Sequence, residues 1–555
     1  MIIRKKRIAT TLGAYLTGVA ISLSSAGAIE LENIGRYGQT DPGLFDGSAA
    51  EIPTYDPATQ SVFVTNAATA SIDVISIADP SAPSLLFSIP LGSETVAGPT
   101  SLVFTGGILA VSLAAEPKTD NGSVAFFDTD GNPVGTPVEV GALPDAITVS
   151  PDGTMLITSN EGEPNDDNTI DPEGSVSIID ISAGVAAATV TTVGFGDLEA
   201  MEAELKSAGV RIFGQIFTDT GDVDEDGDPI FTSTATTVAQ DLEPEFATVS
   251  PDGSTAYVTL QENNAIATVD LASATVTGII PLGLKDHSIW GNEMDPSDKD
   301  GSVAKIRAQK VVGMFQPDAI ASYQVAGQTY LVTANEGDSR DYDNFSEEIR
   351  ADDLPDEGFS FVGGNGLIKN SKKLGRLKTT IAPPETAISG VNRRGEAVLE
   401  NVVAYGARSF SIWSSDGKLV FDSGADFEKL TASLAPEVFN ASNDDPEADN
   451  RSDDKGPEPE GVIVAEFDGT PYAFVTLERI GGIMVYDVSD PANATFEDYI
   501  NTRLPADNGD NSSIEDDLGP EGLVFVAPSQ SPNGEALLIV TNEVSGSTLV
   551  FQINP

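Results

Sequence analysis

The chain has 555 residues, with 29 lysines and arginines against 86 aspartates and glutamates, and a formal net charge of −57. Such a charge opposes association with nucleic acid and attracts divalent cations. The chain has no cysteine and a single histidine, His287, which excludes thiolate-ligated metals and multi-histidine zinc sites. Any bound metal must therefore be held by oxygen, which favours calcium, magnesium or another hard cation.

The beginning of the chain predicts an export signal. Four basic residues at 4–7 precede an apolar run over 8–23 and the small residues Ala26-Gly27-Ala28, the pattern of a secretory signal peptide. We predict a signal peptide over 1–28, a single domain over 29–555, and export to the periplasm or the extracellular space. No later run approaches the ~20 apolar residues of a membrane span, so no transmembrane segment is expected.

A unit of short β-strands repeats along the mature chain. The clearest copy has strands at 462–467, 472–476 and 483–488, separated by turns at Asp468-Gly469 and Gly481-Gly482. A vaguer fourth strand follows in several copies, at 84–90, 187–193 and 274–281. We count seven copies, which begin near Glu51, Gly98, Leu143, Glu243, Gln316, Glu458 and Gly519.

Four short antiparallel strands repeated seven times predict an all-β fold, a seven-bladed β-propeller with long loop insertions on its faces. The last copy ends after its third strand, and residues 31–37 are expected to supply the missing strand and close the ring. A β-solenoid is the alternative, although solenoid repeats are usually shorter. The insertions are expected at 194–240 (with a helix at 198–207), 282–315, 337–400 and 440–457.

Acidic residues recur at two positions of the unit. One acid follows a proline or glycine-proline at the start of the first strand, and another follows the second strand. In an antiparallel unit both positions lie on the same face. An inner set is therefore predicted to surround the mouth of the central channel: Asp145, Glu245, Asp318, Glu460 and Glu521. An outer set is predicted beside it: Glu161, Glu262, Glu336, Glu478 and Glu543.

The first two units depart from this pattern, because Thr100 replaces the first acid of the second unit and Glu51 opens the first. Crowded carboxylates repel one another, so some must protonate or bind cations. We predict metal binding by the two sets. The alternative is that they are solvated or paired with Arg340, Arg350, Arg408 and Arg479.

A separate acidic stretch over 222–228 resembles the start of an EF-hand calcium loop. Asp222, Asp224 and Asp226 precede Gly227, but Ser233 stands where an EF-hand has its closing glutamate. The stretch predicts an isolated calcium-binding turn, with a solvated acidic loop as the alternative.

Several motifs resemble one known family. Residues 332–340 (VTANEGDSR) and 346–350 (SEEIR) are similar to the signature of the choice-of-anchor I family, also called mesenchyme-specific cell-surface glycoprotein-like. Residues 285–287, 406–409, 479–482 and 519–522 fit it as well. The resemblance implies a secreted propeller, linked to biomineralisation in animals and often called an atypical alkaline phosphatase or phytase-like protein in bacteria.

Two functions follow from these observations. The first is a metal-dependent phosphoesterase acting by metal-activated water, with calcium and a second hard cation such as iron, manganese or magnesium. Arg340, Arg350 or Arg408 would bind phosphate, and His287 would serve as general acid. The second is a non-catalytic calcium-binding protein of adhesion or biomineralisation, whose ligand is mineral or matrix. A monomer is expected in either case.

Overall fold

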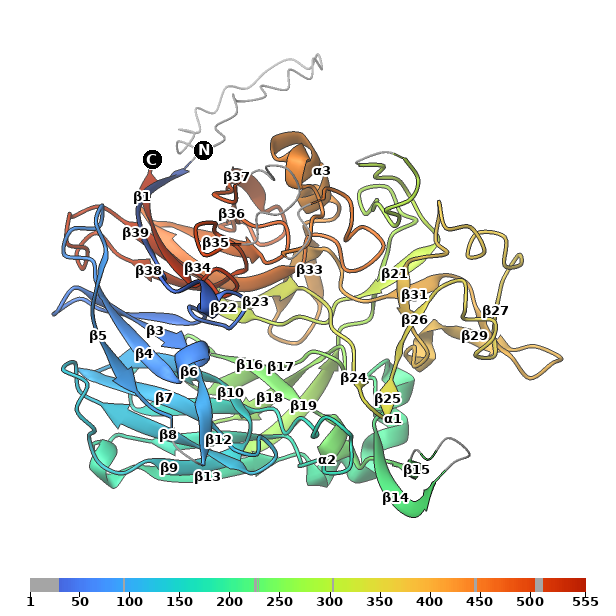
Figure 1. The fold of residues 1–555 in the computed structure, drawn as a ribbon, viewed down its shortest axis with the longest axis horizontal. Helices are drawn as coiled ribbons and strands as arrows, with labels where there is room; N and C mark the ends of the chain where they lie inside the picture. Colours follow the sequence, from blue (N-terminus) through green and yellow to red (C-terminus); the bar gives the residue numbers. More distant parts are fainter. Residues whose placement is uncertain are drawn as a thin grey trace.

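The computed structural model describes residues 29–92, 95–223, 227, 229–301, 304–443, 447–504 and 513–555. The predicted signal peptide lies outside the described residues. Within them the chain forms seven four-stranded antiparallel sheets; five join consecutive strands, one joins two strands across the long insertion at 337–400, and the last joins the first and last strands of the chain. Figure 1 shows the sheets following one another around the body of the molecule.

The first four sheets are formed by β2 (Pro53–Asp56), β3 (Ser61–Asn66), β4 (Ser71–Ser76), β5 (Ser84–Pro90); β6 (Val96–Thr105), β7 (Ile108–Ala115), β8 (Asn121–Phe127), β9 (Val138–Ala142); β10 (Pro144–Val149), β11 (Met155–Asn160), β12 (Ser175–Asp180), β13 (Thr189–Gly194); and β16 (Pro244–Val249), β17 (Thr255–Leu260), β18 (Ala265–Asp270), β19 (Thr275–Pro281). The last three are formed by β22 (Ile320–Val325), β23 (Gln328–Asn335), β32 (Ser409–Ser414), β33 (Leu419–Asp422); β34 (Pro459–Phe467), β35 (Thr470–Leu477), β36 (Ile483–Asp487), β37 (Thr495–Ile500); and β38 (Pro520–Val526), β39 (Leu537–Asn542), β40 (Ser547–Asn554), β1 (Glu30–Gly38).

The sheets close into a ring, which confirms the predicted β-propeller. The first strand of each sheet contacts the first strand of the next, in the order β2, β6, β10, β16, β22, β34 and β38, and β38 contacts β2. The N-terminal strand β1 completes the last sheet by pairing antiparallel with β40, with Leu31 opposite Ile553. The prediction that residues 31–37 close the ring is therefore confirmed, and β1 covers the outer edge of β40, which the last three strands alone would leave unpaired.

Apolar side chains fill the space between neighbouring sheets. Between the fifth and sixth sheets, Val332 and Phe410 pack with Val475 and Tyr486, all fully buried. Strands in the middle of a sheet are covered on both faces, so β3 is buried at every residue. Burial of apolar surface between the sheets is the main stabilising contribution to such a ring.

The insertions are more structured than the sequence indicates. The predicted helix is present as a 3-10 turn at Gly196–Met201 followed by α1 (Glu202–Ala208), which ends at Gly209 with a left-handed φ of 104°. A hairpin of β14 (Gln215–Val223) and β15 (Pro229–Ala235) then extends from the body (Figure 1). The helices α2 (Val238–Asp241) and α3 (Asp426–Leu434) follow blades three and five.

Residues 282–315 and 337–400 form a lobe beside the ring (Figure 1). Leu354, Leu374 and Leu377 belong to its own buried apolar cluster. Its strands have two to four residues each: β20 (Leu284–Asp286), β21 (Val311–Met314), β24 (Asp341–Tyr342), β25 (Phe345–Ser346), β26 (Glu348–Arg350), β27 (Phe359–Phe361), β28 (Lys378–Thr380), β29 (Ile388–Val391), β30 (Ala397–Leu399) and β31 (Val402–Ala404). None of the described helices is long and apolar enough to cross a membrane.

Candidate functional site

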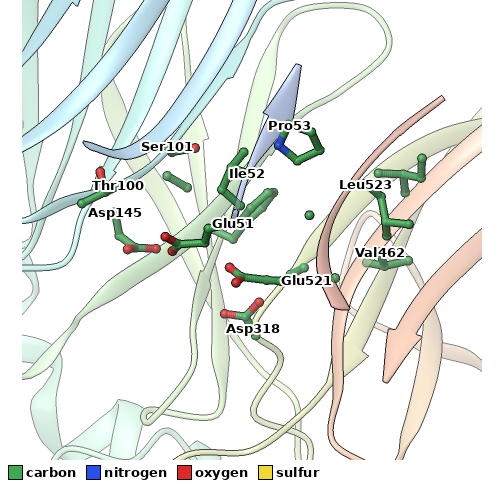
Figure 2. A pocket seen from close by; sticks show the side chains of 16 residues that line it. Glu51, Ile52, Pro53, Thr100, Ser101, Asp145, Asp318, Val462, Glu521 and Leu523 are labelled. Carbon is green, nitrogen blue, oxygen red and sulfur yellow. The ribbon is translucent and has the colours of Figure 1, made fainter. Parts of the chain in front are cut away.

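A pocket lies where the innermost strands of the ring meet. It receives residues from every blade, including Thr100 of the second and Phe246 of the fourth, and encloses about 90 Å³. Four carboxylates line it, those of Glu51, Asp145, Asp318 and Glu521. Figure 2 shows these four side chains pointing toward one another across the opening.

The inner acids are directed into the channel by irregularities in the first strands. In four blades the pairing between the first and second strands shifts register at the acid, as a β-bulge does. A bulge bends the strand and redirects the side chain that it carries. The acids at these bulges are Asp145, Glu245, Glu460 and Glu521.

Threonines of several second strands, among them Thr259, Thr476 and Thr541, connect neighbouring blades at this level. The Thr259 hydroxyl lies 2.9 Å from the carbonyl oxygen of Asp318 in the next blade, and the Thr476 hydroxyl lies 3.3 Å from that of Glu521. Backbones approach so closely here that a Cβ at Gly461 would lie 2.1 Å from the Glu521 carbonyl oxygen. Glycine is therefore required after this acid, and the acids of successive blades are fixed relative to one another.

The outer acids are tied to the start of the same blade. The backbone N–H of Glu161 donates to the carbonyl of Leu143 at 2.9 Å, and that of Glu478 donates to the carbonyl of Glu458 at 2.8 Å. Leu143 and Glu458 immediately precede the prolines and have left-handed φ values of 45° and 51°. This sharp turn places the two acids of a blade side by side.

Burial and mutual repulsion disfavour ionisation throughout the two sets. Burial raises the pKa of Asp145, Glu262, Glu336 and Glu478 to about 7. It raises others well above their usual range, and the neighbouring carboxylates raise them further: Glu161, Glu245, Asp318, Glu460 and Glu521. The pKa of Glu543 is also raised by burial, against the effect of Arg479. The structure therefore brings all ten predicted acids of these sets into one electrostatically coupled cluster.

Three of these carboxylates lie close enough to share an ion. Among the residues that the structure describes, Glu336, Glu460 and Glu478 have carboxylate oxygens that all lie within 4.8 Å of one another. We call them the triad. The Oε2 atom of Glu460 is buried and has no hydrogen-bond partner among the described residues, whereas Arg479 Nε lies 3.1 Å from Glu478 Oε2 and Lys455 Nζ lies 2.6 Å from Glu336 Oε1.

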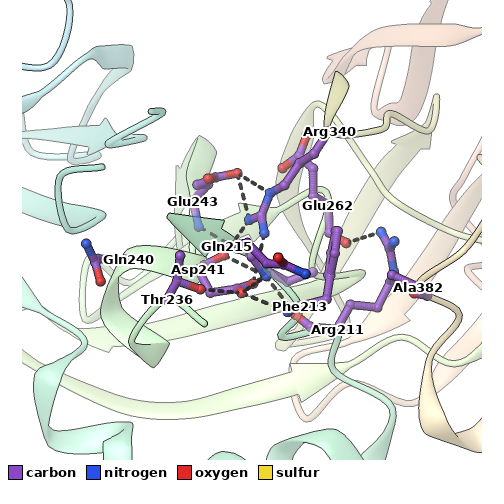
Figure 3. A network of polar contacts seen from close by, with 12 residues as sticks. Arg211, Phe213, Gln215, Thr236, Gln240, Asp241, Glu243, Glu262, Arg340 and Ala382 are labelled. Carbon is purple, nitrogen blue, oxygen red and sulfur yellow. Dashed lines mark hydrogen bonds and ion pairs between the residues drawn. The ribbon is translucent and has the colours of Figure 1, made fainter. Parts of the chain in front are cut away.

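Arg340, predicted to bind phosphate, lies in a buried network beside the outer acids (Figure 3). Its guanidinium lies 3.1 Å from Asp241 and 2.8 Å from Glu243, and its side chain is 4% exposed. Burial lowers the pKa of Arg340, but the charges of Glu243 and Asp241 outweigh burial and raise it. The Phe213 ring lies between Arg340 and Arg211, 4.7 Å and 4.1 Å from their guanidinium carbons.

The other predicted catalytic residues are held away from the triad. Arg350 bonds Asp453, and the buried Arg408 bonds Glu428 and the carbonyls of Ser452 and Asp454. His287 is 2% exposed, and its Nδ1 lies 2.8 Å from the carbonyl oxygen of Asn292. Burial, followed by the charges of Lys285 and Arg408, lowers the pKa of His287 well below its usual value.

The acidic stretch over 222–228 belongs to the first insertion, at 194–240. Asp222 is exposed near the end of β14, and Asp224 and Asp226 lie outside the described residues, so the calcium-turn prediction stays a prediction.

Two residues that the sequence reasoning left out belong to the site. Glu51 lines the pocket, and Lys455 contacts the triad. Glu51 precedes Thr65 by the same spacing that separates Glu245 from Thr259, a signal that could have placed it in the inner set. Nothing in the local sequence around Lys455 distinguishes it from a loop lysine.

Replacing Arg340 by methionine is expected to destabilise the protein by about 3–5 kcal/mol, because it leaves Asp241 and Glu243 buried without a counter-charge. Urea unfolding of the variant measures the loss. Arg394→Met is the matched control, since Arg394 is paired with Glu396 but 79% exposed, and its effect should stay within ~0.5 kcal/mol. Equal losses in the two variants would contradict the assignment of Arg340 to a stabilising network.

The ring of sheets and the carboxylate cluster at its channel define the class: a β-propeller with an acidic channel mouth. The chain belongs to the Choice-of-anchor I family, whose domain model matches residues 51–491, which confirms the resemblance seen in the motifs. Membership of this family indicates an exported or surface protein.

Relatives share part of the chain. Gigasin-3a of Magallana gigas is 31% identical over 168 residues, 28% of this chain and 58% of that protein. The mesenchyme-specific cell surface glycoprotein of Strongylocentrotus purpuratus is 28% identical over 292 residues, 47% of this chain and 36% of that protein. The chain thus spans only part of the length of either relative.

Among solved structures, Kuenenia stuttgartiensis hydrazine synthase aligns with 93% of this chain and 99% of its own, at 13% identity and a TM-score of 0.42. The β-propeller domain of Myceliophteria thermophila Cps50 (Swd1) aligns with 95% of this chain and 100% of its own, at 7% identity and a TM-score of 0.41.

Proposed function

We propose that the carboxylate cluster binds several divalent cations and that the cation-loaded protein hydrolyses phosphate esters. The observation that supports cation binding is the triad, where three carboxylates converge within 4.8 Å and the buried Glu460 Oε2 has no hydrogen-bond partner in the part of the chain that the structure describes. A buried, unpaired carboxylate oxygen is costly unless a cation or a proton neutralises it.

The donor set fits hard cations. The acids of the two sets offer only carboxylate oxygens, the ligands preferred by calcium, magnesium and manganese. The flanking side chains are amides: Gln261 donates to Glu336 at 2.8 Å, and Asn443 donates to Glu478 at 3.4 Å. These amides fix the orientation of the carboxylates, as outer partners of metal ligands commonly do.

Hydrolysis would need a polarised phosphate and a reactive water. Divalent cations bound at carboxylates supply both, by coordinating phosphate oxygens and lowering the pKa of a water molecule. The protein's own basic groups at this place are Lys455 and Arg479, next to Glu336 and Glu478. They replace Arg340, Arg350 and Arg408 as candidate phosphate contacts, because they contact members of the triad, whereas those three arginines contact acids outside it.

A non-catalytic calcium-binding protein is the second candidate, and one observation favours it. Every arginine expected to bind phosphate is tied to carboxylates or carbonyls within the structure, as Arg408 is to Glu428 and Asp454. The same cluster would then bind calcium for stability, adhesion or contact with mineral.

Hydrolysis of p-nitrophenyl phosphate separates the two candidates. The purified protein is assayed with added calcium, alone and together with manganese or iron, and then with excess chelator. A phosphoesterase should lose its activity with chelator and fall at least ~100-fold in Glu336→Gln, since a removed metal ligand disrupts the catalytic cation. Glu466→Gln is the control, because Glu466 is exposed on the same strand as Glu460. Calcium binding without turnover would instead support the second candidate.

A further inference from the structure

Lys455 is a buried lysine placed among carboxylates at the edge of the triad. Its ammonium lies 2.6 Å from Glu336, 3.3 Å from Asp338 and 3.4 Å from Glu458, and its side chain is 12% exposed. Burial lowers its pKa, but the surrounding carboxylates outweigh burial and raise it. Lys455 thus places its ammonium in direct contact with one of the three triad members, Glu336.

The loop that carries Lys455 is fastened from several sides. Arg408 donates to the carbonyls of Ser452 at 2.9 Å and Asp454 at 2.6 Å, and Arg350 donates to the carbonyl of Asp453 at 3.0 Å. Arg408 is 3% exposed, so its contacts with the loop are shielded from water. The loop holds the ammonium in place, unlike a surface lysine that reaches an acid by chance.

Glu458 in the same loop strengthens this arrangement. Its carboxylate lies 2.6 Å from Arg451 and 3.4 Å from Arg479. Burial acts to raise the pKa of Glu458, but Arg451, Lys455 and Arg479 outweigh burial and lower it to about 2. The loop therefore holds Glu458 and its cationic partners in fixed positions beside the triad.

The three triad carboxylates differ in how many of their oxygens already accept a hydrogen bond or pair with a cationic side chain. Glu336 uses Oε1 for Lys455 and Oε2 for the Gln261 amide. Glu478 is paired with Arg479, whereas no described residue gives Glu460 Oε2 a hydrogen bond. An ion entering the triad can bind Glu460 directly, but it must displace the ammonium to bind Glu336 Oε1.

We infer that Lys455 is a tethered counter-ion that competes with divalent cations for Glu336 and so limits cation binding at the triad. This inference rests on the proposed cation binding. An ammonium and a divalent ion within a few ångströms repel each other. The triad therefore binds divalent cations more weakly than the same three carboxylates would without the ammonium, and Lys455 sets the cation concentration at which the triad is occupied.

Calcium titration by calorimetry at about pH 8 tests the inference, with Lys455→Met and Lys455→Arg beside the unaltered protein. Lys455→Met should bind calcium at least about tenfold more tightly at the affected site, or bind one further equivalent, because the competing charge is gone. Lys455→Arg keeps the charge and should resemble the unaltered protein. Unchanged or weaker calcium binding in Lys455→Met would overturn the inference.

Thermal unfolding keeps the test informative if the methionine variant folds poorly. In excess chelator Lys455→Met should unfold at a lower temperature than the unaltered protein, because Glu336 and Glu458 lose a counter-charge. Calcium should raise its unfolding temperature more than that of the unaltered protein, and an equal or smaller rise would overturn the inference. If the unaltered protein binds no calcium, manganese or magnesium, the proposed function itself fails. If it binds them and Lys455→Met binds no better, only the role of Lys455 fails.

Discussion

Stripped of divalent cations, the protein is expected to become less stable as the pH rises from about 5 to about 8, the reverse of the usual behaviour of salt-bridged carboxylates. Burial raises the pKa of Glu336 from 4.5 to about 7 in the folded protein. Between these values the unfolded chain has lost a proton that the folded protein still holds, so rising pH favours unfolding. Each such group contributes roughly 3 kcal/mol of lost stability.

The total loss of stability is smaller than the sum of the losses for the individual carboxylates, because carboxylates that interact strongly share protons and titrate together. Added calcium should abolish the loss, since a bound cation stabilises the ionised carboxylates that the folded state otherwise disfavours. Thermal unfolding at about pH 5 and about pH 8, each in chelator and in calcium, measures the effect. Unfolding temperatures that do not respond to calcium at the higher pH would contradict cation binding by the cluster.

Glu478→Gln provides the control for this pH dependence. The pKa of Glu478 is also raised to about 7, mainly by burial, and an amide cannot titrate. The variant should therefore lose less stability over the same pH interval in chelator.

The blades and their acids could be predicted because both are repeated local patterns. Alternation of apolar residues between glycine turns predicts strands wherever they occur. Antiparallel order then assigns the faces, which is why Glu336, Glu460 and Glu478 could be expected near one another.

The roles of the arginines could not be predicted, because their partners are distant in sequence. From the sequence, Arg350 and Arg408 are predicted to bind phosphate, yet their partners are Asp453 and Asp454 of a loop rich in acids and asparagine. Sequence shows that a guanidinium is available, but not which carboxylate or carbonyl it meets. The same limit applies to Lys455, whose contact with Glu336 joins the insertion at 440–457 to the end of β23.

The lobe formed by residues 282–315 and 337–400 could not be predicted from the sequence for a different reason. Strands such as β24 and β25 have two residues each, too few for an alternating pattern to appear. Its apolar residues, among them Leu354 and Leu374, are spread through a polar sequence and gather only in three dimensions.

Glu460→Gln is expected to change stability and cation binding in opposite directions. Burial, followed by the charges of Glu336 and Asp318, raises the pKa of Glu460 well above its usual value. Replacing this carboxylate by a neutral amide of the same shape removes the repulsion, so in chelator at about pH 8 the variant should be more stable by roughly 1–3 kcal/mol. The same change removes a ligand from the triad, and calcium affinity there should fall at least about tenfold.

Urea unfolding in chelator and calcium titration of the same samples measure the two effects. Glu466→Gln is matched to it, because Glu466 lies on β34 as well but is exposed, and it should alter neither quantity. A structural glutamate would give a different result: its replacement would lower stability in chelator and calcium alike. A gain in stability together with a loss of calcium affinity arises only if the ionised Glu460 carboxylate destabilises the cation-free protein and binds the cation in the cation-bound protein. A loss of stability in chelator would contradict this role of Glu460.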